Sequence, residues 1–137
     1  MHKLISTLHT GSHSLVVGGT ATRTFDGRGV ADLYRLLHEE PKLLRGASVA
    51  DKVVGKGAAA LMAAARIKRV YADVISQPAL HLLNAEGIDA EYATLVPHII
   101  NRAGTGMCPL EARCQACATT EECLAQIDLF INEMRQK

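Results

Sequence analysis

The chain has 137 residues, a formal net charge of +1 at pH 7, and a composition that is 48% hydrophobic but only 4% aromatic. This length predicts one domain, residues 1–137, which is large enough to bury a core without disulfides or a structural metal. The near-neutral charge argues against a nucleic-acid-binding protein, and the longest apolar runs are too short to cross a membrane.

The first third of the chain predicts two helices with a hairpin between them. Gly18 and Gly19 separate two short apolar or β-branched runs, which is a turn signal typical of a hairpin. Pro41 ends the helix that follows. The expected elements are a helix over residues 3–10, strands over 14–17 and 22–25, and an amphipathic helix over 30–37.

The middle of the chain predicts a helix, a strand and a second helix, over residues 51–67, 70–75 and 78–86. Small apolar side chains dominate the first helix, and they share one stripe at helical spacing. Residues 47–50 are either a short strand or the lead into this helix. Ser76 and Pro78 start the second helix, and Gly87 ends it.

The last third predicts two more strands, at residues 90–95 and 98–101, and then a cysteine-containing helical segment over 107–137. Thr119 and Glu122 form a capping box that starts the final helix. Alternation of strands and helices predicts an α/β fold, and two helix starts should meet at one end of a strand, where such folds build their sites.

Three runs carry a resemblance to a known family: Ala50 to Lys56, Val70 to Ala79, and Val96 to Glu111. In these runs the chain resembles a small uncharacterised bacterial family of the DUF1893 type, which is placed in the cytidine-deaminase-like fold. The resemblance implies a three-layer α/β/α arrangement with a mixed sheet. It implies no established activity.

Zinc deaminases place His-x-Glu at one helix start and Pro-Cys-x-x-Cys at the next. Here the first helix start offers no histidine, cysteine or glutamate between Val54 and Gly57. At the second start Pro78 is present, but Ala79 and Leu82 stand at the two cysteine positions and His81 falls between them. The sequence therefore excludes a zinc-dependent hydrolytic deaminase and leaves open whether another reaction is catalysed.

Basic and polar residues stand at the same helix starts. In the predicted helix, Lys52 and Lys56 are four residues apart and would be neighbours near its positive end. Ser76 at the second start and the turn beginning Asn101-Arg102 add further anion-binding groups. These five residues predict a site for a small anionic ligand, such as a nucleotide or phosphate. The alternative is that both lysines are solvated.

All four cysteines lie in the last third, at Cys108, Cys114, Cys117 and Cys123. Their clustering predicts a zinc or iron–sulfur site, although the spacing matches no standard motif. The alternatives are thiols buried by packing, or a reactive Cys108 near Arg102. The competing function is therefore a thiol- or metal-dependent enzyme or redox protein.

Two expectations concern the protein as a whole. The first residues lack the apolar core of a signal peptide, so a cytoplasmic location with reduced thiols is expected. The open edge of a small sheet allows a homo-oligomer.

Overall fold

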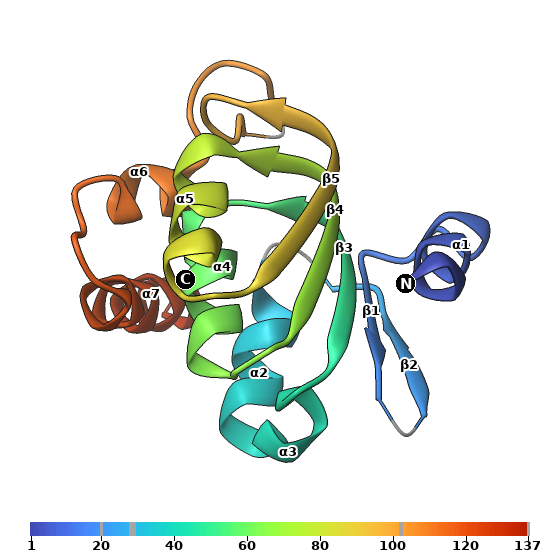
Figure 1. The fold of residues 1–137 in the computed structure, drawn as a ribbon. Helices are drawn as coiled ribbons and strands as arrows, with labels where there is room; N and C mark the ends of the chain where they lie inside the picture. Colours follow the sequence, from blue (N-terminus) through green and yellow to red (C-terminus); the bar gives the residue numbers. More distant parts are fainter. Residues whose placement is uncertain (20, 28–29, 102, 137) are drawn as a thin grey trace.

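Five strands form one mixed sheet in the computed structural model, which describes residues 1–19, 21–27, 30–101 and 103–136 (Figure 1). The order of the strands across the sheet is β2-β1-β3-β4-β5. Their bounds are β1 Leu15–Gly18, β2 Thr22–Phe25, β3 Ser48–Val54, β4 Arg69–Ser76 and β5 Asp89–Val96.

The three strands β3, β4 and β5 run parallel, whereas β1 is antiparallel to both of its neighbours. Val49 pairs with Val70 and Val54 with Ile75, so β3 and β4 end side by side. The carboxyl ends of all three parallel strands therefore meet at one edge of the sheet, and the helices that follow β3 and β4 begin there.

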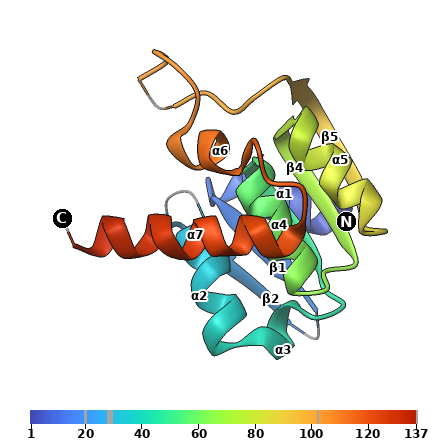
Figure 2. The ribbon, with the colours of Figure 1, turned by 90° about the vertical axis from the view of Figure 1, so that its left-hand side faces the viewer.

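Helices cover both faces of the sheet, which gives three layers (Figures 1 and 2). The helix α1 lies alone on one face, and the other helices lie on the opposite face. The helices are α1 His2–Thr10, α2 Ala31–Glu39, α3 Pro41–Leu44, α4 Lys56–Ala64, α5 Gln77–Ala85, α6 Pro109–Cys114 and α7 Thr120–Arg135.

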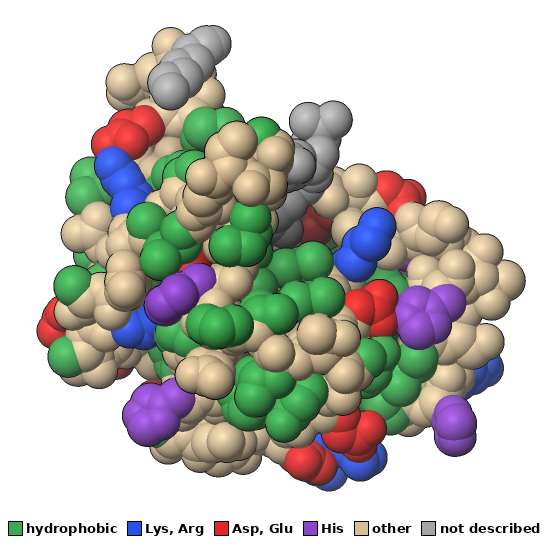
Figure 3. All heavy atoms as spheres, turned by 90° about the horizontal axis from the view of Figure 1, so that it is seen from above, with side chains coloured by type: hydrophobic (Ala, Val, Ile, Leu, Met, Phe, Trp, Pro, Cys, Tyr) green, Lys and Arg blue, Asp and Glu red, His purple; other side chains and the backbone are tan. Residues whose placement is uncertain are grey.

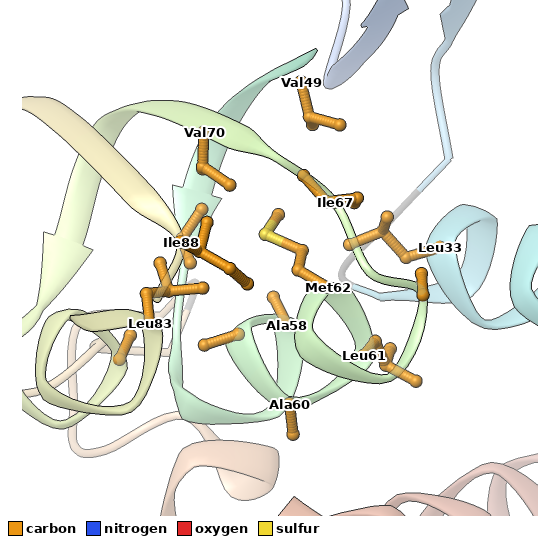
Figure 4. Close-up of a cluster of buried hydrophobic side chains, with 14 of the residues drawn as sticks. Leu33, Val49, Ala58, Ala60, Leu61, Met62, Ile67, Val70, Leu83 and Ile88 are labelled. Carbon is orange, nitrogen blue, oxygen red and sulfur yellow. The ribbon is translucent and has the colours of Figure 1, made fainter. Parts of the chain in front are cut away.

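The larger hydrophobic core lies between the sheet and α4. Met62 of α4 is fully buried, and Figure 4 shows it lying between Val70 and Ile67, with Leu83 and Ile88 to one side. The small side chains of α4 let the helix pack closely against the sheet. As a result, its residues from Gly57 to Met62 are all buried. A smaller cluster under α1 joins Leu4, Leu8, Val16, Ala50 and Tyr71.

The predicted helix over 51–67 is wrong at its start. Residues up to Val54 belong to β3, and α4 begins only at Lys56 after Gly55. Ala58 and Leu61 of the predicted stripe do lie in α4 and are buried, but Val49, Val53 and Val54 are β-branched and suit a strand. Pairing on both sides, with β1 and β4, then fixes this segment as a central strand.

The other elements follow the sequence more closely. The strand and helix around Pro78 are confirmed, and Ser76 caps α5 by accepting the backbone N–H of Ala79 at 3.3 Å. The strand predicted at 98–101 is wrong, because in the described residues only an isolated bridge joins Ile100 to Met107. The short helices α3 and α6 were not separately predicted.

Candidate functional site

The starts of α4 and α5 meet around one buried carboxylate, that of Glu111 in α6. Only 2% of Glu111 is exposed. One of its oxygens, Oε1, accepts the backbone N–H of Lys56 at 2.8 Å and the hydroxyl of Ser76 at 3.3 Å. The other, Oε2, accepts the backbone N–H of Ile99 at 2.7 Å. A buried acid with three donors is well compensated, and it places negative charge at the positive end of α4.

Gly55 makes room for this carboxylate. Its backbone is extended at φ −96° and ψ −179°, so conformational freedom is not the reason for a glycine here. A Cβ at this position would lie 3.4 Å from each Glu111 carboxylate oxygen and 3.2 Å from Cγ1 of Ile99. The absence of a side chain therefore lets Ile99 pack against the start of α4, and Gly57 does the same for Leu110 of α6, since a Cβ there would lie 2.7 Å from Cδ2 of Leu110.

Glu111 also corrects the argument for an external anion at the start of α4. That argument rested on two lysines on adjacent turns of one helix, but Lys52 lies on β3 and is exposed. The backbone N–H of Lys52 donates to Ser14 at 3.0 Å, within the sheet. Because the chain's own Glu111 supplies the charge, the helix start needs no external anion.

The ammonium group of Lys56 points away from Glu111, toward the segment between α6 and α7. Its Nζ donates to the carbonyl of Cys117 at 2.6 Å and to the carbonyl of Gln115 at 3.3 Å. Lys56 forms no ion pair with any carboxylate in the described part of the chain. Its positive charge is therefore held by neutral carbonyl groups.

Lys56 lines a cavity of about 890 Å³ between α5 and the start of α7. Its other polar residues include two histidines, His81 and His98, and two acids, Glu86 and Glu121. The Nδ1 atom of His98 is buried and has no hydrogen-bond partner among the described residues. Sequence reasoning gave His81 and His98 no functional role, and only the fold brings them near Lys56.

The remaining predicted ligand residues lie elsewhere. Ser76 is fully buried, and its hydroxyl is engaged by Glu111 and by the cap of α5. The side chain of Asn101 exchanges two hydrogen bonds with Thr105, each 3.1 Å long, which close its own turn. Gly104 has φ +72°, a conformation that favours glycine in such a turn. Arg102 lies outside the described residues.

The residues at the two helix starts do not fit the catalytic zinc site of a zinc deaminase. Ala79 and Leu82 have no ligand atoms, and both are buried in the hydrophobic core. His81 is exposed on α5 and lines the Lys56 cavity instead. No step that depends on a metal can be assigned to these residues.

Comparison with known proteins gives the same fold and a family. A family model described as a domain of unknown function, DUF1893, matches residues 3–131. The chain belongs to the DUF1893 family. A crystal structure of a DUF1893 family protein from Thermotoga maritima aligns with a TM-score of 0.85 and 26% identity, covering 92% of this chain and 86% of that one. No curated protein matches.

The four-cysteine site stays a prediction for this DUF1893 protein. No three histidine, cysteine, aspartate or glutamate side chains among the described residues are placed to hold a metal. Cys108 lines a different cavity, described below. Burial raises the pKa of Cys114 to about 11 and that of Cys123 to about 12, with neighbouring cysteines adding to the effect. Both thiols therefore stay protonated at neutral pH.

The described helices of this DUF1893 protein include none that is both long enough and apolar enough to span a bilayer.

Proposed function

We propose that this DUF1893 protein binds a small anionic ligand of the nucleotide or phosphate class in the Lys56 cavity. The observation that carries the proposal is the environment of the Lys56 ammonium group. An ammonium has three donors, and the carbonyl groups of Gln115 and Cys117 engage two of them. The third donor and the whole positive charge remain for a ligand.

The walls of the cavity support a ligand larger than inorganic phosphate. A volume of about 890 Å³ lies within the range of small-molecule sites. The imidazoles of His81 and His98 can donate to a phosphate group. The carboxylates of Glu86 and Glu121 would instead suit hydroxyl or amino groups, which a nucleotide has and phosphate lacks.

The resemblance to the cytidine-deaminase-like fold agrees with this position, since ligands of such folds bind where the helix starts converge. Thiol-dependent chemistry has no comparable support. Cys114 and Cys123 are buried with raised pKa values, so neither supplies a thiolate at neutral pH.

Thermal unfolding in the presence of nucleotides and phosphate tests the proposal. A ligand at a hundredfold excess over its dissociation constant should stabilise the protein by about 2.7 kcal/mol. Lys56→Met should abolish this response. His81→Ala should weaken it, because the variant removes a donor from the cavity wall, and the exposed position of His81 means that folding should not be perturbed. The matched control is Asn84→Ala, which changes an exposed residue of α5 that does not line the cavity. An unchanged response in Lys56→Met would refute the site.

A further inference from the structure

We infer that a second cavity, beneath the C-terminal half of α7, binds a small anionic amphiphile. Such a ligand has a short apolar body and a negatively charged head group. This site is separate from the Lys56 cavity and does not depend on the function proposed above.

The cavity is a built apolar site of about 640 Å³. Its walls come from α2, the end of β3, the start of α4, α6 and α7, so several elements far apart in the sequence enclose it. Figure 2 shows the C-terminal end of α7 extending beyond α4 and α6. The apolar lining is Val30, Val53, Ile99, Leu110, Phe130, Ile131 and Met134.

Two charged groups at the lining orient the ligand. Glu111 belongs to the lining, but it is 2% exposed and its oxygens already accept three hydrogen bonds. It therefore offers an anion only repulsion. Arg135 also belongs to the lining, is exposed, and forms no ion pair with a described carboxylate. An anionic head group is therefore attracted to Arg135 and an apolar body to the interior.

The aromatic face of Tyr34 fixes the position of Arg135. The guanidinium carbon lies 6.0 Å from the centre of the Tyr34 ring, and the Tyr34 hydroxyl donates to Asp128 at 2.7 Å. A guanidinium held over a ring keeps its planar donors for a sulfate, phosphate or carboxylate group. Met134, which is 56% exposed, lies beside it at the mouth.

Exposed apolar residues occur elsewhere in the described part of the chain, but without an arginine beside an apolar cavity. Figure 3 looks onto the end of the molecule where the parallel strands finish, and shows hydrophobic side chains gathered near its centre. A hollow of about 440 Å³ at this end is lined by Val53, Val74, Val96, Pro97, His98, Ile99 and Ile100. Among the residues that the structure describes, its lining has no arginine or lysine to select a ligand.

Alkyl sulfates below their micelle concentration are suitable probes, with the alcohols of the same length as neutral counterparts. Calorimetric titration of the wild type with hexyl, octyl and decyl sulfate should give affinities that rise by about fourfold per added methylene until the cavity is full. Octyl sulfate should bind at least tenfold more tightly than octanol. Binding without either trend, or no saturable binding, would overturn the proposal.

Variants on α7 locate the site. Ile131→Trp should fill the cavity and weaken octyl sulfate at least tenfold, and Met134→Trp at the exposed mouth tests the same effect should Ile131→Trp fail to fold. The matched control is Leu129→Trp, which is 52% exposed and outside the lining. Equal binding in the wild type and in the folded cavity variants would contradict the site.

The charge is tested separately. Arg135→Glu should weaken the binding of octyl sulfate while leaving that of octanol unchanged. Lys68→Glu, which changes an exposed cation between α4 and β4 outside the lining, should alter neither. Light scattering identifies the competing occupant. A wild-type dimer that binds no octyl sulfate and that dissociates in Ile131→Trp would show that a second copy of the chain covers this cavity, and would overturn the proposal.

Lys56→Met should leave octyl sulfate binding intact. This variant therefore separates the test of the second cavity from the test of the Lys56 cavity.

Discussion

The carboxylate of Glu111 accepts the backbone N–H of Lys56 across 2.8 Å, although the two residues lie 55 positions apart in the chain. The same oxygen accepts the hydroxyl of Ser76, which caps the neighbouring helix. One side chain thus joins α6 to the starts of both α4 and α5.

Removal of the negative charge of Glu111 should destabilise the folded state. Glu111→Gln replaces one acceptor oxygen by an NH₂ group that faces backbone N–H donors, so we expect a loss of roughly 2–4 kcal/mol in the free energy of unfolding. Urea denaturation measures it. Glu39→Gln is the control, because Glu39 is exposed at the end of α2 and its change should stay within about 0.5 kcal/mol. Equal stability of both variants would show that Glu111 is not a structural acid.

The space at Gly55 gives a second prediction. Gly55→Ala introduces a Cβ 3.2 Å from Cγ1 of Ile99, so the Ile99 side chain must shift by a few tenths of an ångström, and we expect a destabilisation of about 1 kcal/mol in thermal or urea unfolding. Gly106→Ala is the matched control, since no atom lies within 4 Å of its added Cβ. If Gly55→Ala were as stable as Gly106→Ala, the close packing of Ile99 against Gly55 would be of no energetic consequence.

Asp51 predicts a pH dependence of stability. It is 8% exposed on β3, and burial raises its pKa from 3.8 to about 7. Between these values the folded state keeps a proton that the unfolded state releases, so the free energy of unfolding falls as the pH rises from about 4 to about 7. The full effect is at most roughly 4 kcal/mol.

Asp51→Asn should remove this contribution, so the difference in stability between variant and wild type should change steadily across the window. Urea unfolding at a series of pH values measures it. Asp89→Asn, at an exposed position on β5, should change the pH profile much less. A constant difference between Asp51→Asn and the wild type from pH 4 to pH 7 would contradict the raised pKa.

The cysteines should differ in reactivity. Cys114 and Cys123 are fully buried with raised pKa values, so iodoacetamide at pH 8 should modify them only when the protein unfolds. Cys117 and Cys108 are half-buried and should react first. Mass spectrometry of peptides at successive times gives the order. Modification of Cys114 at the rate of Cys117 in the folded protein would contradict the structure.

Local signals in the sequence predicted local structure well. Ser76 and Pro78 mark the start of α5, and Thr119 caps α7 by accepting the N–H of Glu122 at 3.1 Å. Such capping interactions join residues only a few positions apart, so they do not depend on how the rest of the chain folds. The start of α4 was misplaced because Val54 fits the helical stripe of the residues that follow it, while pairing in the sheet decided the conformation of residues 51–54.

Long-range contacts were beyond the reach of the sequence. Glu111 stands in the first turn of a six-residue helix, and nothing near it in the chain indicates that it becomes buried against Gly55. Lys56 was singled out from the sequence, but its position at the cavity wall follows from the fold of residues 114–121. A candidate site built from residues far apart in the chain becomes visible only once the sheet order places them together.

The position of Glu111 late in the chain also bears on the order of folding. During synthesis the strands β1 to β5 and the helices α4 and α5 emerge before α6. Until residue 111 follows, the first N–H of α4 and the hydroxyl of Ser76 lack the acceptor that they share in the finished protein. Closing a loop of this length costs conformational entropy before any contact repays it. The sheet can thus form during translation, whereas the helix starts acquire their final arrangement only after the last third of the chain has been made.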